Sequence, residues 1–295
     1  MHVVLIHIGD NLPDYFWLAC EQVRRFFPGQ IHVIIPDKYV CSNSIQRIGL
    51  NPVATEHLMN THTYRMFNQV CFLKGFWNVT MGRLFLLEEL IKTKKLEEVI
   101  HIENDVLIYT NPGNLLNEFK MVSNKAVLLT PIDNIHMSAA YMYVENHVSL
   151  SMLNSRIVQY LQRGENGLRH EIGIRDINEM ILLNHIWKKY DLIKSLPITP
   201  RGKGNRSFTI FKSLFDGASY GQFLGGTDGG KNPGWISNSH WAGQLLKTNK
   251  YSFHWERLKN GCKIPYLLEH ISKQNVLNWK INNLHIHSKN LRKFM

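Results

Sequence analysis

Apolar residues in the first part of the chain form short continuous runs separated by a helical stripe. Val3 to Ile8 is a compact apolar run, which is typical of a strand buried on both faces. Asp14 to Phe27 carries apolar residues at helical spacing, and Ile31 to Ile35 is a second buried-type run closed by proline. Strand, helix and strand in this order predict the start of a parallel sheet, whose ligands lie beyond the carboxyl ends of its strands.

The same two patterns continue further along the chain. Apolar residues at helical spacing predict a helix from Lys74 to Lys95, with lysines gathered at its end where cations suit the helix dipole. Buried-type runs predict strands within the segments 99–109, 126–130 and 138–144. The polar, glycine-bearing segment 163–175 is expected to be a loop, and a helix is predicted from residue 176 to residue 187. This alternation predicts an α/β protein.

Two carboxylates interrupt the apolar segment 98–109. Glu103 and Asp105 stand two positions apart where a strand ends and extended structure resumes. Burying such charges is costly unless a cation compensates them. Acids at this spacing can direct both carboxylates into one crevice and hold a divalent ion through oxygen ligands. The alternative is an ordinary turn, for which Glu-Asn-Asp is also suited.

Two other features point to ligand contacts near this acidic turn. The loop from His7 to Asn11 follows the first strand, so His7, Ile8 and Gly9 are candidate nucleotide contacts. The dinucleotide fingerprint GxGxxG is absent there. Arg83 lies off the apolar stripe of its helix. It is either a solvated surface arginine or one that reaches the nucleotide or sugar beside the acidic turn.

Two further carboxylates are candidates for proton transfer. Asp176 and Glu179 have the spacing of a capping box, so the structural interpretation of both is satisfaction of helix N-terminal donors. Asp216 lies in the glycine-rich segment 215–230, where the backbone can approach a ligand closely or close as a lid. We favour Asp216 over Glu179, because the capping box already explains Glu179.

The C-terminal segment carries two histidines and a lysine at alternate positions. On a strand, His285, His287 and Lys289 share one face and line one wall. A neutral histidine can complete a metal shell begun by carboxylates, and a lysine can neutralise phosphate oxygens. We expect His287 to be the ligand, since it lies nearer the end of the strand.

Composition narrows the choice of protein class. The chain has 295 residues, enough for one large core, and its net charge of +11 favours an anionic partner. Its four cysteines form no CxxC pair, which indicates neither a disulfide scaffold nor a zinc cluster. No apolar run approaches the roughly 20 residues needed to span a bilayer. A cytoplasmic location is therefore expected.

The ordered set of motifs resembles the metal-dependent GT-A glycosyltransferases, over nearly the whole chain. The motifs are Gly82-Arg83-Leu84-Phe85, His101-Ile102-Glu103-Asn104-Asp105-Val106, Asn178-Glu179-Met180 and His285-Ile286-His287-Ser288-Lys289. The resemblance is closest to cytoplasmic sugar transferases of bacteria and large DNA viruses, which would place a viral enzyme in the host cytoplasm. It implies one GT-A domain over residues 1–295, with a Rossmann-like, mixed and mostly parallel sheet flanked by helices.

The resemblance also implies roles for individual residues. The acidic DXD motif of these enzymes holds Mn²⁺ or Mg²⁺, although here the first acid is glutamate. The implied metal ligands are Asp105, His287, His285 and Glu103. The implied contacts to the nucleotide sugar are His7, Ile8, Gly9, Arg83, Glu103, Asn104 and Lys289. Residues 1–110 would then bind the nucleotide, and residues 111–295 would bind the acceptor and supply the C-terminal metal and phosphate segment.

The expected activity is transfer of a sugar from a nucleotide-diphosphate sugar, such as a UDP-sugar, to a glycan or glycoprotein hydroxyl. Inversion at the anomeric carbon needs a base, for which Asp216 and Glu179 are the candidates. The competing hypothesis is a non-catalytic protein that binds nucleic acid or an anionic glycan. Basic residues are spread through the chain without a recognition-helix or RNP-like pattern. We therefore expect no nucleic-acid partner.

Overall fold

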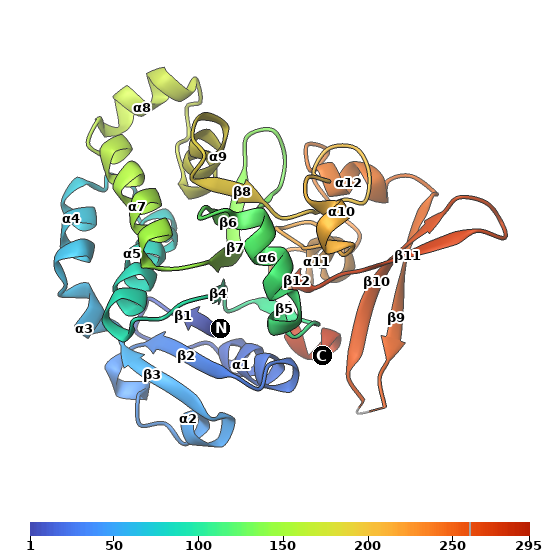
Figure 1. Cartoon of the computed structure of the whole chain (residues 1–295), viewed down its shortest axis with the longest axis horizontal. Helices are drawn as coiled ribbons and strands as arrows, with labels where there is room; N and C mark the ends of the chain where they lie inside the picture. The colour runs from blue at the N-terminus through green and yellow to red at the C-terminus, as the bar shows by residue number, and fades with distance from the viewer. Residues whose placement is uncertain (260) are drawn as a thin grey trace.

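The computed structural model describes residues 1–259 and 261–295. A seven-stranded sheet lies at its centre, in the order β3-β2-β1-β4-β7-β6-β8 (Figure 1). Its strands are β1 His2–Ile6, β2 Gln30–Ile35, β3 Leu50–Ala54, β4 Val99–Ile102, β6 Val127–Pro131, β7 Met137–Val144 and β8 Ile193–Ser195. Strand β7 runs antiparallel to both of its neighbours, and the other pairs are parallel. The predicted mixed, mostly parallel sheet is confirmed.

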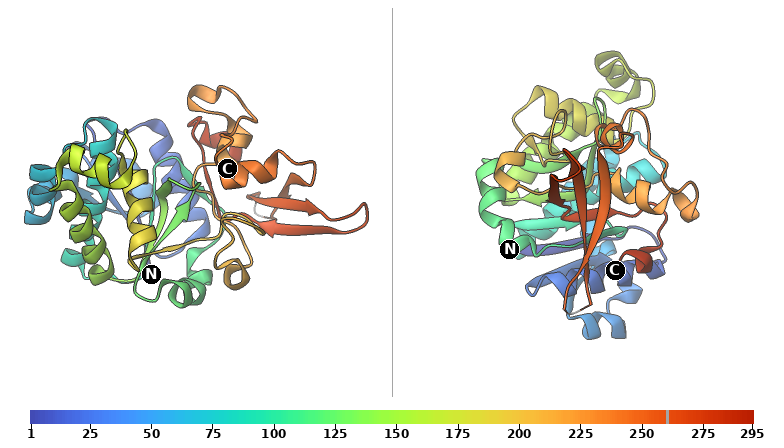
Figure 2. Two further views of the ribbon diagram at one scale, coloured as in Figure 1. Left: turned by 90° about the horizontal axis from the view of Figure 1, so that it is seen from above. Right: turned by 90° about the vertical axis from the view of Figure 1, so that its right-hand side faces the viewer.

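Helices cover both faces of this sheet (Figure 2). The helices are α1 Asp14–Phe26, α2 Asn43–Ile48, α3 Thr55–Met59, α4 His62–Val70, α5 Phe76–Lys94, α6 Leu116–Ser123, α7 His147–Leu161, α8 Gly164–Ile172, α9 Glu179–Lys189, α10 Phe208–Phe211, α11 Tyr220–Gly225 and α12 Trp241–Leu246. Short 3₁₀ turns are η1 Asp37–Tyr39, η2 Pro112–Leu115, η3 Asp228–Gly230 and η4 Leu291–Phe294. Among the described residues, no helix combines the length and apolar character that a bilayer crossing requires.

Strand β1 shows why the N-terminal run is continuously apolar. Val3 and Leu5 pack into one core with α1, whereas Val4 and Ile6 pack into a second core with α5 and α7 on the opposite face. Successive side chains of a strand point to opposite faces. Each position of the strand therefore needs an apolar residue.

The C-terminal part of the chain contributes strands to two smaller sheets. Strand β12, Asn283–His285, pairs antiparallel with β5, Val106–Ile108, which follows the acidic turn. Strands β9 Tyr251–Arg257, β10 Lys263–His270 and β11 Val276–Lys280 form a three-stranded antiparallel sheet. This second sheet projects from the body as an arm (Figures 1 and 2). The sequence patterns did not predict the arm.

Two expectations about local structure are wrong. The segment expected to be a loop contains α8, whose exposed Glu165 and Arg169 form an ion pair four residues apart. The helix expected to begin at Asp176 begins instead at Glu179, because Asn178 caps it by accepting a hydrogen bond from the Ile181 amide at 3.1 Å. Asp176 is therefore not the cap. Glu179 is not needed to satisfy the N-terminal amide donors of the helix, which is the role that the capping box predicted for it.

Candidate active site

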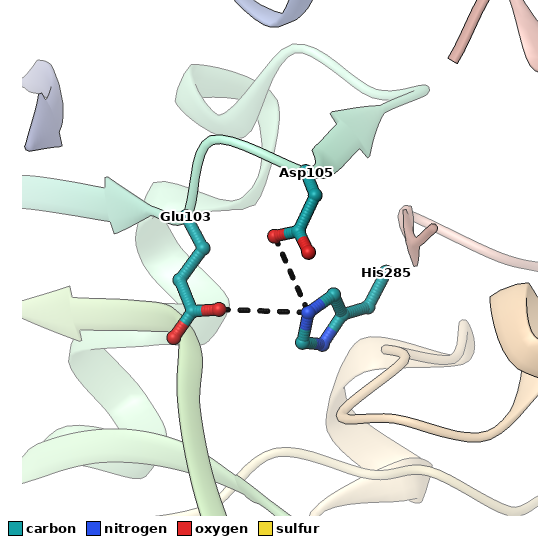
Figure 3. Close-up of side chains that lie close together, drawn as sticks. All are labelled: Glu103, Asp105 and His285. Carbon is teal, nitrogen blue, oxygen red and sulfur yellow. Dashed lines mark ion pairs between the residues drawn. The ribbon is translucent and has the colours of Figure 1, made fainter. Parts of the chain in front are cut away.

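The acidic turn and the C-terminal strand meet beside the carboxyl end of β4. Glu103 follows the last residue of β4, and Asp105 precedes β5. The Ile286 amide donates to the carbonyl of Asp105 at 2.8 Å, which places His285 next to the turn. One ligand atom from each of Glu103, Asp105 and His285 lies within 4.8 Å of the other two (Figure 3). Two carboxylates and an imidazole are a suitable donor set for a divalent ion.

The imidazole of His285 is oriented for this role. Its Nδ1 lies 2.7 Å from the carbonyl oxygen of Gly217, so Nδ1–H donates to that carbonyl. Its Nε2 faces the acids, 3.3 Å from Asp105 Oδ1 and 3.5 Å from Glu103 Oε2. Burial lowers the pKa of His285, but the two carboxylates raise it by more, to about 9. A backbone acceptor on Nδ1 is the usual arrangement that leaves Nε2 available to a metal.

Lys289 is the second cation beside Asp105. Its ammonium forms an ion pair with Asp105 Oδ2 and lies 5.8 Å from the centre of the Tyr15 ring. Burial raises the pKa of the Asp105 carboxyl, but His285 and Lys289 lower it by more, well below its usual range. Asp105 is therefore a carboxylate at neutral pH, and Lys289 stands where it can meet a second anion.

Arg83 compensates the other acids of the site. Its side chain is 10% exposed, and Nη2 lies 2.6 Å from Glu103 Oε1 and 3.8 Å from Glu179 Oε2. Burial raises the pKa of Glu103, whereas Arg83 and His285 lower it by more. The interpretation of Arg83 as a solvated surface residue is wrong. It lies beside the acidic turn and holds one oxygen of Glu103, leaving the other directed at His285.

Glu179 is a buried carboxylate at the start of α9. It is 3% exposed, and among the described residues its Oε1 has no hydrogen-bond partner. Burial raises the pKa of Glu179, although Arg83 opposes this shift. A carboxyl group with a raised pKa and an unpaired oxygen in a pocket is suited to receive a proton.

Asp216 occupies a different position. It does not line the pocket described below, and its buried carboxylate binds four backbone amides. Oδ1 accepts from the amides of Ser219 at 2.7 Å and Tyr220 at 2.9 Å, and Oδ2 accepts from those of Gly221 at 2.8 Å and His285 at 2.9 Å. The preference for Asp216 as the base is not supported, because both of its oxygens are already used to fix the start of α11 and strand β12.

His287 lines the same pocket as His285 and Lys289, as the alternate spacing predicts. Its ring centre lies 4.3 Å from that of His285, yet it is not part of the group of close ligand atoms. Burial, together with the neighbouring His285, lowers the pKa of His287 to about 3. The group of close ligand atoms favours His285 over His287 as the candidate metal ligand, and the choice between them stays a prediction.

These residues line a pocket with a volume of about 520 Å³. Strands β1 and β4 are parallel neighbours, and the residues that follow them, including His7 and Ile8, form one wall. Asn104 donates a hydrogen bond to His7 Nδ1 at 3.2 Å and joins this wall to the acidic turn. Gly9 does not line the pocket. A volume of this size suits a ligand of the size of a nucleotide sugar.

The sequence patterns missed several pocket residues. Tyr15 comes from the start of α1, Phe76 and Trp77 come from the start of α5, and Asp228 comes from the glycine-rich segment. Phe76 is 69% exposed. The sequence signal for Phe76 and Trp77 is an aromatic pair directly after Gly75, at the start of a helix.

Comparison with known proteins gives matches of fold only. No family model and no curated protein sequence matches the chain. Similar solved structures include mouse xyloside xylosyltransferase 1 in its apo form, with 11% identity, a TM-score of 0.46, and coverage of 66% of this chain and 84% of that one. Galactosyltransferase LgtC, solved with donor and acceptor sugar analogs, has 12% identity, a TM-score of 0.43, and coverage of 67% and 73%. Glycosyltransferase GlyE of Streptococcus pneumoniae has 14% identity, a TM-score of 0.43, and coverage of 66% and 44%. These similar structures are GT-A type glycosyltransferases.

Proposed function

We propose that the chain is a metal-dependent glycosyltransferase that moves a sugar from a nucleotide-diphosphate sugar to a hydroxyl of a glycan or glycoprotein. The observation that carries this proposal is one pocket containing Glu103, Asp105 and His285 as a donor set, with Glu179 and Lys289 beside it. The pocket lies beyond the carboxyl ends of parallel strands, where α/β sheets bind ligands. A non-catalytic binding protein would not need a buried carboxylate with a raised pKa in its pocket.

The donor set fits Mn²⁺ or Mg²⁺, with Glu103, Asp105 and His285 as the ligands. When bound, such an ion supplies positive charge to the diphosphate as the bond between sugar and phosphate breaks. Lys289 is placed to stabilise the same leaving group, and its ammonium needs no metal to do so. The wall of His7, Ile8 and Tyr15 would hold the nucleotide, for which uridine is our proposal.

Glu179 is the proposed base for an inverting reaction. As an acceptor hydroxyl oxygen forms its bond to the anomeric carbon, its proton passes to the Glu179 carboxylate, and the nucleotide diphosphate leaves with the bonding electrons. Arg83 lies between Glu103 and Glu179 and keeps both carboxylates in place without protonating either. Residues 1–110 would supply the nucleotide wall, and residues 111–295 would supply the base and the acceptor surface.

The experiment is a hydrolysis screen of UDP-, GDP- and CMP-sugars, with and without Mn²⁺, together with thermal unfolding in the presence of UDP. We expect one nucleotide sugar to be cleaved only with metal, and UDP and Mn²⁺ together to raise the melting temperature more than either does alone. NMR of a transfer product then gives its anomeric configuration. No cleavage and no joint stabilisation would contradict the proposed function, and retained configuration would contradict the inverting mechanism alone.

A further inference from the structure

The excess of basic over acidic residues lies entirely in the C-terminal third of the chain. Residues 1–200 contain 19 lysines and arginines and 19 acids, whereas residues 201–295 contain 15 and 4. Within the described residues, eight of the first 19 basic side chains form ion pairs with acids, but only Arg201 and Lys289 of the last 15 do so. The whole net charge of +11 therefore lies in residues 201–295, where few basic side chains are paired with an acid.

Part of this charge is gathered where the arm meets the C-terminal turn η4. Arg257 and Lys263 are opposite each other in the pairing of β9 with β10, so they share a face with Trp255, two residues before Arg257. The Trp255 ring centre lies 6.2 Å from that of Phe294, which belongs to η4. We call the basic residues at this junction the basic face: Arg257, Lys259, Lys263, Arg292 and Lys293.

Within the part of the chain that the structure describes, no acid is paired with the basic face. Glu256 is next to Arg257 in sequence but faces the opposite side of the arm, where it acts on Tyr266 and Lys280. Four of the five side chains are exposed, and that of Lys263 is half-buried. None of the five forms an ion pair among the residues that the structure describes. Like charges held together repel one another, and an anionic ligand relieves this repulsion.

The surroundings of the basic face distinguish between kinds of polyanion. None of its members, and none of the residues directly beside them, is among the exposed large apolar side chains of the described chain. Phe294 is buried, and the partly buried Trp255 ring packs against the rings of Phe294 and Tyr109, which limits the ring face left for a base to stack on. Membrane insertion needs exposed apolar side chains, and base stacking needs exposed aromatic rings. A flexible acidic glycan needs only the charges.

We propose that the basic face binds an acidic glycan, which is the acceptor of the reaction or the chain that carries it. This inference rests on the proposed function. Turn η4 begins two residues after Lys289, which lines the pocket, so the basic face continues from the pocket edge along the chain. An acceptor with carboxylate or sulfate groups would be held at this face while one of its hydroxyls reaches the pocket.

The test compares two variants that each lose five positive charges. The basic-face variant is Arg257→Gln, Lys259→Gln, Lys263→Gln, Arg292→Gln and Lys293→Gln. The matched control removes exposed cations of the neutral part of the chain: Arg65→Gln, Lys94→Gln, Lys95→Gln, Lys125→Gln and Arg175→Gln. Binding of fluorescent heparin, the probe for an acidic glycan, is followed by anisotropy from 50 to 200 mM salt, with neutral dextran as the blank.

Five contacts to a polyanion predict that the wild-type affinity for heparin falls about 10²–10³-fold over this salt range. We expect the basic-face variant to bind heparin about 100-fold more weakly than wild type at 50 mM salt, and the control to stay within about fivefold. Donor hydrolysis should be equal in all three proteins, since neither set lines the pocket.

Other results would overturn the inference. Equal losses of heparin affinity in the two variants would show that binding depends only on the net charge of the protein. Absence of heparin binding by the wild type would contradict the acidic-glycan site. Tighter binding of a single-stranded RNA or of anionic lipid vesicles than of heparin, lost in the basic-face variant, would assign the face to those partners instead. Absence of donor hydrolysis in wild type would contradict the proposed function and leave the binding comparison as a separate result.

Discussion

The choice of catalytic base can be tested by replacing Glu179 with glutamine, which keeps the shape of the side chain and removes its capacity to accept a proton. A positioned base contributes about 10²–10⁴-fold, so turnover of Glu179→Gln should fall by that factor. Asn178 caps α9 and Glu103 still pairs with Arg83, so the free energy of unfolding should change by no more than about 1 kcal/mol. Affinity for the nucleotide sugar should stay the same.

The matched substitution is Asp216→Asn, which we expect to show the opposite pattern. Each Asp216 oxygen accepts two backbone amides, so an amide group in place of one oxygen leaves two buried donors without an acceptor. At about 1–3 kcal/mol for each unsatisfied group, the loss of stability is about 2–6 kcal/mol. For a chain of this length that lowers the melting temperature by roughly 4–12 °C.

Both variants are assayed for turnover, KM and thermal unfolding, and activity is measured well below the melting temperature of the weaker protein. The assignment of Glu179 as the base is refuted if Asp216→Asn loses 100-fold or more in turnover while its melting temperature is unchanged. It is also refuted if Glu179→Gln turns over at the wild-type rate. In the first case the carboxylate that binds four amides would be the base after all, and in the second the reaction would need no base at this position.

Three further predictions concern the metal site and the response to acid. Asp105→Asn should lose the rise in melting temperature that Mn²⁺ and UDP give together, which at 100 times the dissociation constant is worth about 2.7 kcal/mol in wild type. His285→Gln should lose the same rise, whereas His287→Gln should keep it, and the reverse result would restore His287 as the ligand. Burial lowers the pKa of His32 and of His101 to about 4, so the unfolded chain takes up more protons between pH 6.5 and 4. The free energy of unfolding should therefore fall by about 2–3 kcal/mol per histidine as the pH drops over that range, as measured by urea titrations. In the His101→Phe variant the total fall should be smaller, because one of the two histidines is gone.

The sequence was sufficient to predict the sheet and the acidic turn. Runs such as Val3 to Ile8 must be buried on both faces, and a pair of charges at the end of such a run must have a partner. The partners were harder to assign. From the sequence, contact with the acidic turn was only one of two alternatives for Arg83. An arginine off the apolar stripe of a helix can extend into solvent as easily as it can pair with a carboxylate, as it does here.

Local sequence signals failed where the backbone conformation at a helix end decides the outcome. Asn178 and Asp176 are both good caps, and only the backbone conformation shows that Asn178 is the residue before the first helical turn. The glycines around α8 indicated a loop, but Gly164 and Gly173 lie at its first position and its C-cap, with positive φ angles. A glycine with a positive φ angle commonly ends a helix, so Gly173 marks the end of α8 and not a loop through the segment.

Which histidine belongs to the proposed metal site depends on the pairing of β12 with β5, which no sequence pattern gives. Antiparallel pairing places His285 opposite Val106, next to Asp105. A slip of one residue would turn His285 away from the acids and bring Leu284 or Ile286 toward them, because alternate side chains point to opposite faces. Both of those side chains are fully buried in the core beneath the site, so a slip would expose one of them and remove a proposed ligand at the same time. The apolar residues on either side of His285 thus determine which histidine meets the carboxylates.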